Sequence, residues 1–421
     1  MSSGGLFVDI TPIRRSRDFR LLWLCQFVSW SGRQTVLVAM PYQVYILTHS
    51  SFAVGLLGLI QVGPIIVAGL YGGALADKFD RRRVQLVSKT VLALGSIALA
   101  IGAIHLQAPV AVVFVLAAVC SATWAIDQAA RAATMPRLVS RELLPSAMSL
   151  MQVTFQTASI GGPALCGLII ATAGVAWAYA FDAVAYFPVV ALLLLLSPQP
   201  AVEGHHVSLS WRAPAEAIRY VRGHRLLVGL FSADLIAMIF GMPTAVFPAL
   251  ALTAFGYGPT ALGLLYAAPA AGALIGSVLS GWVRRVSRQG MAVFVAIAVW
   301  GLAIAAFGLT GRVLWIGLAF LAIAGAADLV SAIFRSTILQ LSIPDTMRGR
   351  MSAFHSMVTT SGPRLGDLEA GAVAALVNPV FSVVSGGIAC VVGIGLLAAL
   401  LPQMRAQRAS AEVSVPRPVV G

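Results

Sequence analysis

Three charged side chains lie within a few residues of one another in a stretch that is otherwise small or apolar. Arg364, Asp367 and Glu369 occur in the segment 362–371, GPRLGDLEAG. In a helix, Arg364 and Asp367 would share one face, whereas Glu369 would point roughly 200° away from Asp367. Burial favours the neutral form of a carboxyl group and a nearby guanidinium favours the ionised form, so the cluster has the chemistry to exchange protons. A buried ionic network that only fixes the helix register is the alternative.

Two further acid–base pairs lie at helical spacing. Asp127 and Arg131 are four residues apart, so we expect a direct pair within one helix. Asp328 and Arg335 are seven apart and could form a ladder with a neighbouring helix. Structural or gating roles are favoured for both pairs. The four cysteines and six histidines show no metal-ligand spacing, so neither a metal site nor a cofactor is expected.

The elements that must position these residues are twelve long apolar stretches. The chain is 59% hydrophobic and only 10% charged, and each stretch is near the length of about 20 residues that a helix needs to cross a bilayer. The pattern predicts an all-α membrane protein with 12 transmembrane helices, near 20–44, 52–76, 84–105, 109–134, 144–171, 176–197, 226–251, 260–283, 290–309, 313–341, 349–376 and 379–402.

Basic residues are sorted onto alternate connectors. Of 28 Lys and Arg residues, 24 lie in the N-terminal arm, the C-terminal tail, or the segments 78–89, 131–141, 212–225, 284–288 and 348–350. Short basic loops stay in the cytoplasm, so both termini are predicted to be cytoplasmic. The net charge of +13 is scattered rather than gathered on one face. This favours the anionic inner leaflet over nucleic acid as the partner.

Charged residues inside the predicted spans are candidates for function. A charge at the bilayer centre costs about 2.5–3.5 kcal/mol, so it normally faces a cavity, pairs or titrates. We expect Arg33, midway along the first span, to pair with Asp367 or Glu369 or to attract an anionic ligand. Asp367 and Glu369 are the preferred proton-coupling acids, and Asp234 and Asp328 are the second choice.

A polar interval divides the hydrophobic body into two halves. Residues 1–197 and 226–402 are each predicted to form a six-helix bundle, and Gly162-Pro163 recurs as Gly362-Pro363. Six is even, so the halves form a parallel repeat. The interval, 198–225, is predicted to be a cytoplasmic linker with an amphipathic surface helix, or else a solvated linker. The tail, 403–421, is predicted to be disordered.

The segment that follows the second span carries the most specific motif. It reads GGALADKFDRRR over residues 72–83 and resembles the loop signature Gly-x-x-x-Asp-(Arg/Lys)-x-Gly-Arg-(Arg/Lys) of the major facilitator superfamily. The matching residues are Gly73, Asp77, Lys78, Arg81 and Arg82, whereas Asp80 replaces a glycine.

The resemblance implies a cytoplasmic gate in which Asp77 contacts Arg81 and helices of the other half, with Arg131 as a second candidate partner. Asp127 and Arg131 are included in this gate. Gly73 would let the second span approach a neighbour closely. A charged loop that only sets the topology is the alternative.

The fifth span contains Ala158-x-x-x-Gly162-Pro163-x-x-x-Gly167. It partly resembles the antiporter signature of the same superfamily, with a kink at Gly162, Pro163 and Gly167. Local matches such as Pro41-Tyr42-Gln43-Val44 resemble the branch of enterobactin exporters and drug-efflux proteins. The resemblance therefore implies export of siderophores or amphipathic drugs.

These features together favour a secondary active exporter, not an enzyme, in the bacterial inner membrane. It would work as a monomer by alternating access and exchange protons for an amphipathic small molecule. Uptake by proton symport, or a sensor or scaffold that transports nothing, are the alternatives. The candidate cavity residues are Arg33, Arg364, Trp30, Gln34, Tyr42 and Gln61.

Overall fold

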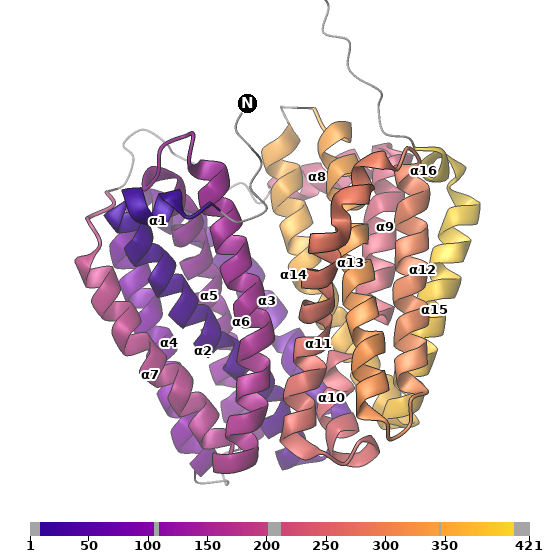
Figure 1. Ribbon diagram of the computed structural model, residues 1–421, viewed down its shortest axis with the longest axis horizontal. Coiled ribbons are helices and arrows are strands. Elements are labelled where there is room, and N and C mark those ends of the chain that lie inside the picture. The colour runs from indigo at the N-terminus through magenta and orange to yellow at the C-terminus, as the bar shows by residue number, and fades with distance from the viewer. Residues whose placement is uncertain (1–8, 105–108, 201–211, 345–346, 408–421) are drawn as a thin grey trace, which may run out of the picture.

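The protein is described by a computed structural model over residues 9–104, 109–200, 212–344 and 347–407. Across these ranges the chain forms helices and connecting turns, without a strand. Figure 1 shows the helices as two bundles that stand side by side. The predicted all-α class is confirmed.

The first bundle contains the short helix α1 (Thr11–Arg15) and six long helices. The long helices are α2 (Arg17–Thr48), α3 (Ser51–Lys78), α4 (Arg81–Ile104), α5 (Val110–Thr134), α6 (Leu144–Ala173) and α7 (Val175–Leu195). Residues at the helix ends explain several of these boundaries. Ser16 caps α2 by accepting a hydrogen bond from the Phe19 N–H at 3.1 Å, and Gly174 ends α6 with a φ of 94°.

The second bundle contains α9 (Arg225–Phe240), α11 (Gly258–Leu279), α12 (Gln289–Gly308), α13 (Leu314–Ser342), α14 (Arg348–Leu376) and α15 (Pro379–Leu400). A short helix, α16 (Pro402–Ala406), follows it. The rest of the predicted tail, residues 408–421, lies outside the described residues.

The seventh span is broken rather than continuous over 226–251 as predicted. It consists of α9, the turn η2 (Thr244–Val246), α10 (Phe247–Ala249) and the π-turn η3 (Leu250–Ala254). The Trp300 indole N–H donates to the Gly241 carbonyl at 2.9 Å and so satisfies one backbone group freed by the break. Gly241 and Pro243 in the sequence disfavour a continuous helix at this point and could have predicted the interruption.

Ten described helical segments are long and apolar enough to cross a membrane. The helices α2 and α14 have comparable length but fall outside that set. They carry Arg33 and the Arg364–Asp367–Glu369 cluster respectively. Both helices also contribute residues to the cavity between the bundles.

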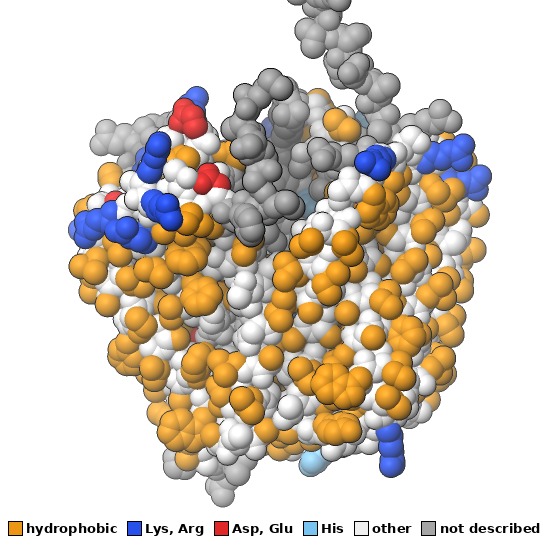
Figure 2. Space-filling model, viewed as in Figure 1, with side chains coloured by type: hydrophobic (Ala, Val, Ile, Leu, Met, Phe, Trp, Pro, Cys, Tyr) orange, Lys and Arg blue, Asp and Glu red, His pale blue; other side chains and the backbone are white. Residues whose placement is uncertain are grey.

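Figure 2 shows apolar side chains over the waist of the molecule and basic side chains along the end that carries α1 and α16. This is the distribution expected of a protein whose waist contacts lipid. One connector residue is an exception. Lys89, counted above with the basic segment 78–89, is only 2% exposed and lies inside the first bundle on α4.

The helix predicted in the polar interval is α8 (Arg212–Gly223). Its residues Ala217 and Val221 are buried, and α8 packs against α9 and α14. Glu216 on α8 lies 3.3 Å from Arg350. Its buried apolar residues therefore face protein, and the position of this helix at the membrane surface stays a prediction. Residues 201–211, including Trp211, lie outside the described residues.

The bundles touch through two glycine crossings at the end opposite α1 and α16. A Cβ added at Gly167 on α6 would lie 2.6 Å from the Pro259 carbonyl oxygen on α11. A Cβ at Gly55 on α3 would lie 2.5 Å from the Asp367 carbonyl oxygen on α14. Only glycine permits such backbone contact. In Figure 1 the bundles diverge toward the end that carries α1 and α16.

Candidate functional site

A cavity of about 300 Å³ lies between the two bundles. Helices α2, α3 and α6 line it from one side, and η2, α10, α11 and α14 line it from the other. Most of its wall is apolar, formed by residues such as Leu37, Leu57 and Phe247. Its polar lining residues are Gln34, Gln61, Ser159, Thr244, Tyr266, Arg364 and Asp367. An apolar pocket with a few convergent polar groups suits a small amphipathic molecule.

Asp367 is the carboxyl group of this cavity, and it is 7% exposed. It accepts a hydrogen bond from the Thr244 hydroxyl at the broken part of the seventh span. Arg364 Nη1 lies 3.9 Å from Asp367 Oδ2, which is a loose contact at the edge of ion-pair distance. Tyr266 supports the site from α11, because its hydroxyl donates to the Thr244 carbonyl at 3.2 Å. The predicted neighbours Arg364 and Asp367 are therefore together, and Thr244 is the residue that sequence reasoning missed.

Glu369 does not line the cavity. It is half-buried two residues further along α14, consistent with the expected change of direction around the helix. Among the described residues it forms no ion pair. The short separation of Glu369 from Asp367 in the sequence therefore does not put the two acids in one site.

Besides Arg364, the predicted cavity residues Gln34 and Gln61 line the cavity. The Gln34 amide Nε2 donates to Ser159 Oγ at 2.5 Å, which joins α2 to α6. Gln61 Oε1 is buried and has no hydrogen-bond partner among the described residues. Trp30 and Tyr42 are not part of the cavity lining.

Arg33 and Arg131 each lie over a tryptophan of the opposite helix. The Arg33 guanidinium on α2 is 5.6 Å from the ring centre of Trp124 on α5. The Arg131 guanidinium on α5 is 5.0 Å from the ring centre of Trp30 on α2. The expected pairing of Arg33 with Asp367 or Glu369 is thus wrong in this conformation. A guanidinium over an indole face is an electrostatically favourable alternative to a carboxylate.

The expected Asp127–Arg131 pair is also wrong. Asp127 Oδ2 lies 2.8 Å from the ammonium of Lys89, which also donates to Ser29 Oγ at 2.7 Å. The Arg131 Nε–H instead donates a hydrogen bond to Gln128 Oε1 on the same helix at 2.8 Å. Sequence spacing identified neighbours on one helix, whereas packing supplied a stronger partner from α4.

Asp328 and Arg335 of the tenth span form an ion-pair network with a neighbouring helix, as their spacing suggested. Arg335 Nη2 lies 3.0 Å from Asp234 on α9 and 3.5 Å from Asp328 on its own helix. Asp234 and Arg335 are almost fully buried, whereas the Asp328 side chain is 41% exposed. Asp234 and Asp328 therefore share one cation in the second bundle, away from the cavity lining.

The motif after the second span ties the end of the first bundle together. Asp77 lies 3.6 Å from Arg81. Arg81 donates to the Ala133 carbonyl at 3.0 Å, and Arg82 donates to the Leu193 carbonyl at 2.7 Å. Lys78 is exposed and lies over the Phe79 ring. In this conformation Asp77 forms no ion pair or hydrogen bond with Arg131 or with the other half in the described part of the chain.

Two departures from expectation in this motif have clear causes. Asp80, which replaces the usual glycine, accepts hydrogen bonds from the N–H groups of Arg82 and Arg83 and so caps α4. The close approach to a neighbour is made by Gly72 rather than Gly73. A Cβ at Gly72 would lie 3.0 Å from Ile126 on α5, whereas Gly73 has open space around it.

The fifth-span motif connects three helices. A Cβ at Gly162 would lie 2.4 Å from Gln34 Cβ on α2, so this glycine allows α2 and α6 to pack closely. Pro163 lines the cavity, and Gly167 forms the crossing with Gly263 on α11. The three residues therefore lie between the cavity and the contact that holds the halves together.

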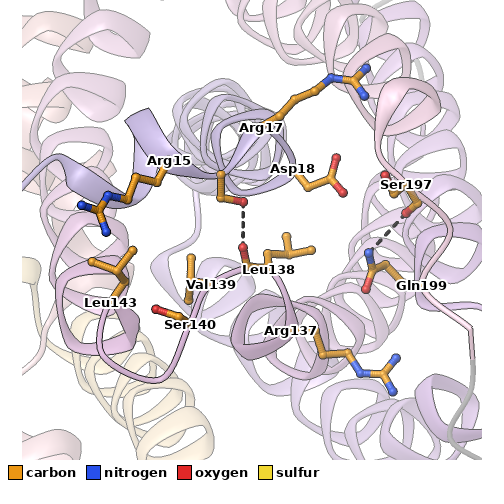
Figure 3. A pocket seen from close by; sticks show the side chains of 11 residues that line it. Arg15, Arg17, Asp18, Arg137, Leu138, Val139, Ser140, Leu143, Ser197 and Gln199 are labelled. Atoms are coloured by element: carbon orange, nitrogen blue, oxygen red, sulfur yellow. Dashed lines mark hydrogen bonds between the residues drawn. The ribbon is translucent and has the colours of Figure 1, made fainter.

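A larger depression of about 680 Å³ lies at the end that carries α1. Arg15, Arg17 and Arg137 of the first bundle and Gln199 just after it are among its lining residues, and none comes from the second bundle. In Figure 3 the three guanidinium groups point away from one another. The smaller cavity is the candidate site, because both halves build it, whereas no residue of the second bundle lines the larger depression.

The described residues contain no group of three or more His, Cys, Asp or Glu that could hold a metal ion. His205 and His206 lie outside the described residues.

The comparison with known families agrees with this architecture. Residues 8–421 match the family described as transmembrane secretion effectors, within the major facilitator superfamily. The chain belongs to this family. As a member, it is a multi-pass transporter of the inner membrane that binds small-molecule substrates.

Among its relatives is an enterobactin exporter of Citrobacter koseri, which is 30% identical over 408 residues covering 95% of each chain. An enterobactin exporter of Salmonella typhimurium is 28% identical and covers 98% of this chain and 99% of its own. The resemblance to the enterobactin-exporter and drug-efflux branch is therefore confirmed.

Solved transporters share the fold of this family member. The nucleoside transporter NupG superposes with a TM-score of 0.74 at 13% identity, covering 92% of this chain and 99% of that one. A bacterial homologue of the iron transporter ferroportin, in an inward-facing state, gives 0.66 at 16% identity, covering 93% and 99%. At such identities the likeness establishes the fold alone.

Proposed function

We propose that this transporter exports anionic, amphipathic small molecules in exchange for protons that enter from outside. The observation that carries the proposal is a single buried carboxyl group, Asp367, in an otherwise mostly apolar cavity between the two bundles. A carboxyl group in such a place binds a proton readily once the cavity opens to a proton-rich side. The relatives are enterobactin exporters, and enterobactin is the first cargo to test.

The contacts around Asp367 suggest how proton binding and gating are connected. The backbone of Asp367 lies against Gly55 at the crossing of α3 with α14, so the carboxyl group and the crossing belong to one rigid part of α14. Separation of the halves at that crossing would change the surroundings of the carboxyl group. Protonation and opening would therefore influence each other, as alternating access requires.

The proposed orientation in the membrane decides which end of the molecule is closed in this conformation. With both termini in the cytoplasm, the glycine crossings lie at the outer end, and the conformation is closed outside. Asp77 and Arg81 would then belong to the cytoplasmic end, where the halves would meet in the opposite state and where the gate is proposed. We propose that one chain is sufficient, because both halves of the cavity come from the same polypeptide.

Proteoliposomes containing the purified protein test the coupling directly. An imposed pH gradient should drive labelled enterobactin against the direction of proton flow, and Asp367→Asn should abolish the response to the gradient. Glu369→Gln is the matched control, because Glu369 lies on the same helix outside the cavity. Cargo that moves together with protons would support uptake by symport, and no flux of any cargo would support a sensor or scaffold.

A further inference from the structure

The first bundle buries a carboxyl group, Asp182, that has no cation beside it. Asp182 lies on α7 and is 2% exposed. Its Oδ2 accepts a hydrogen bond from the Ser96 hydroxyl of α4 at 2.5 Å. Its Oδ1 is buried and has no hydrogen-bond partner among the described residues. No Lys or Arg of the described chain lies within ion-pair distance of it.

The backbone of α2 encloses this carboxyl group. A Cβ added at Gly32 would lie 2.4 Å from Asp182 Oδ1, so the absence of a side chain at Gly32 leaves the space that the carboxyl oxygen fills. The cations close enough to act on Asp182 are Arg33 and Lys89. Both are engaged elsewhere, because Lys89 is paired with Asp127 and Arg33 lies over Trp124.

The other titratable groups around Asp182 do not supply a positive charge. Helix α5 presents Asp127 and Cys120, and Tyr186 belongs to α7 itself. Helix α6 contains no Lys, Arg, Asp, Glu or His between Leu144 and Ala173. Arg33 and Lys89 are therefore the only basic groups that influence Asp182 among the described residues.

An ionised carboxylate with one unsatisfied oxygen and no adjacent cation is strongly disfavoured in an apolar interior, whereas the neutral acid fits there. We propose that Asp182 is a second proton-binding site, inside the first bundle, that holds a proton on Oδ1 in this conformation. When the O–H bond breaks, its electron pair stays on the carboxylate and the proton passes to water. The new charge then attracts the Arg33 guanidinium away from Trp124.

This site is separate from the Asp367 site and does not depend on its role. Its consequence for transport comes through α2. Arg33 directly precedes Gln34, which lines the cavity, so the protonation state of Asp182 would set the position of a cation close to the cargo. The first bundle would thus bind and release a proton of its own during the transport cycle.

The protonation state of Asp182 can be measured by infrared spectroscopy on the purified full-length protein near neutral pH. The carbonyl stretch of a buried neutral carboxylic acid should be present in the wild type and weakened in Asp182→Asn. Asp127→Asn is the matched control, because Asp127 is equally buried but is paired with Lys89. That control should keep the band. A spectrum of Asp182→Asn that retains the full band would overturn the proposal.

Thermal unfolding separates protonation from a purely structural role. Asparagine resembles the neutral acid, so Asp182→Asn should melt no lower than the wild type, whereas Asp127→Asn leaves Lys89 uncompensated and should melt lower. Equal losses of Tm in the two variants would contradict a neutral Asp182 in the fold.

The movement of Arg33 can be followed by tryptophan fluorescence, even if Asp182→Asn fails to fold. Raising the pH should change the emission of the wild type, and Trp124→Phe should lose that change. Asp182→Asn, where it folds, should lose the change as well. A pH response that survives Trp124→Phe would contradict the proposed movement.

Discussion

The Thr244 hydroxyl donates a hydrogen bond to the Asp367 carboxyl group across the interior of the second bundle. Thr244 begins the turn η2, which exists only because the seventh span is interrupted after Phe240. Discontinuous spans expose polar groups at the membrane midplane, where transporters bind ions and substrates. The break therefore places a donor against the one acid of the central cavity.

Removing this donor should weaken proton coupling. Thr244→Val keeps the shape of the side chain but loses the hydroxyl, and a hydrogen bond to a charged group contributes about 1.5–3 kcal/mol. We expect the maximal rate of proton-driven export to fall by about tenfold or more, with a changed pH dependence. Thr253→Val is the control, because Thr253 lies in the same broken span but bonds only to the Ala249 carbonyl. Equal effects of the two variants would contradict a role at Asp367.

Removing one member of the Lys89–Asp127 pair should destabilise the protein, whereas replacing both members together should not. Lys89→Met or Asp127→Asn leaves one buried charge without a partner and should lower the free energy of unfolding by about 3–5 kcal/mol. The double variant Lys89→Met/Asp127→Leu should be close to the wild type or more stable. Denaturant unfolding in detergent measures all three. Losses that simply add in the double variant would show that the two side chains do not compensate each other.

The crossing of α6 with α11 should control the equilibrium between the two conformations. Gly167→Val introduces side-chain atoms where even a Cβ would lie 2.6 Å from the Pro259 carbonyl oxygen, so the halves should separate at this end. Gly161→Val is the matched control on the same helix, because Gly161 has open space around it. Spin labels at the exposed positions Thr172 and Tyr257 report the separation. The distance between the labels should grow in Gly167→Val and stay unchanged in Gly161→Val.

Arg33 should favour anionic cargo. Its guanidinium lies over Trp124, it directly precedes the cavity residue Gln34 in the sequence, and no carboxylate of the described residues is paired with it. We expect Arg33→Gln to reduce export of an anionic cargo by about tenfold, equivalent to about 1.4 kcal/mol, and to spare a cationic one. Arg312→Gln, in the exposed connector between α12 and α13, should leave both unchanged. Equal losses for both cargoes in Arg33→Gln would exclude selectivity by charge.

The sequence predicted the pairs that are local and missed those that depend on packing. Arg364 and Asp367 were expected to be neighbours because three residues separate them on one helix. The same logic failed for Asp127 and Arg131, because Lys89 and Trp30 from other helices supply better partners. Lys89 was counted with the basic segment 78–89 although it also lay within the predicted span 84–105, and only the packed structure shows that it is buried beside Asp127.

The glycines of the motif also show that the sequence identifies a segment but not which of its residues makes the contact. The sequence identified the segment 72–83, but whether Gly72 or Gly73 approaches α5 depends on the rotation of α3, which periodicity does not fix. Likewise, Glu369 and Asp367 are two residues apart, and only the packed structure shows that Asp367 alone reaches the cavity.

The sequence by itself determined that this chain crosses a membrane many times, how its basic residues are distributed, and which family it resembles. These properties follow from hydropathy and charge, which act residue by residue. Only the tertiary structure decided which helices meet, because a helix in lipid gains little from hiding its apolar faces and associates through shape and polar contacts. The glycine crossings, the Thr244–Asp367 contact and the solitary Asp182 are results of that packing.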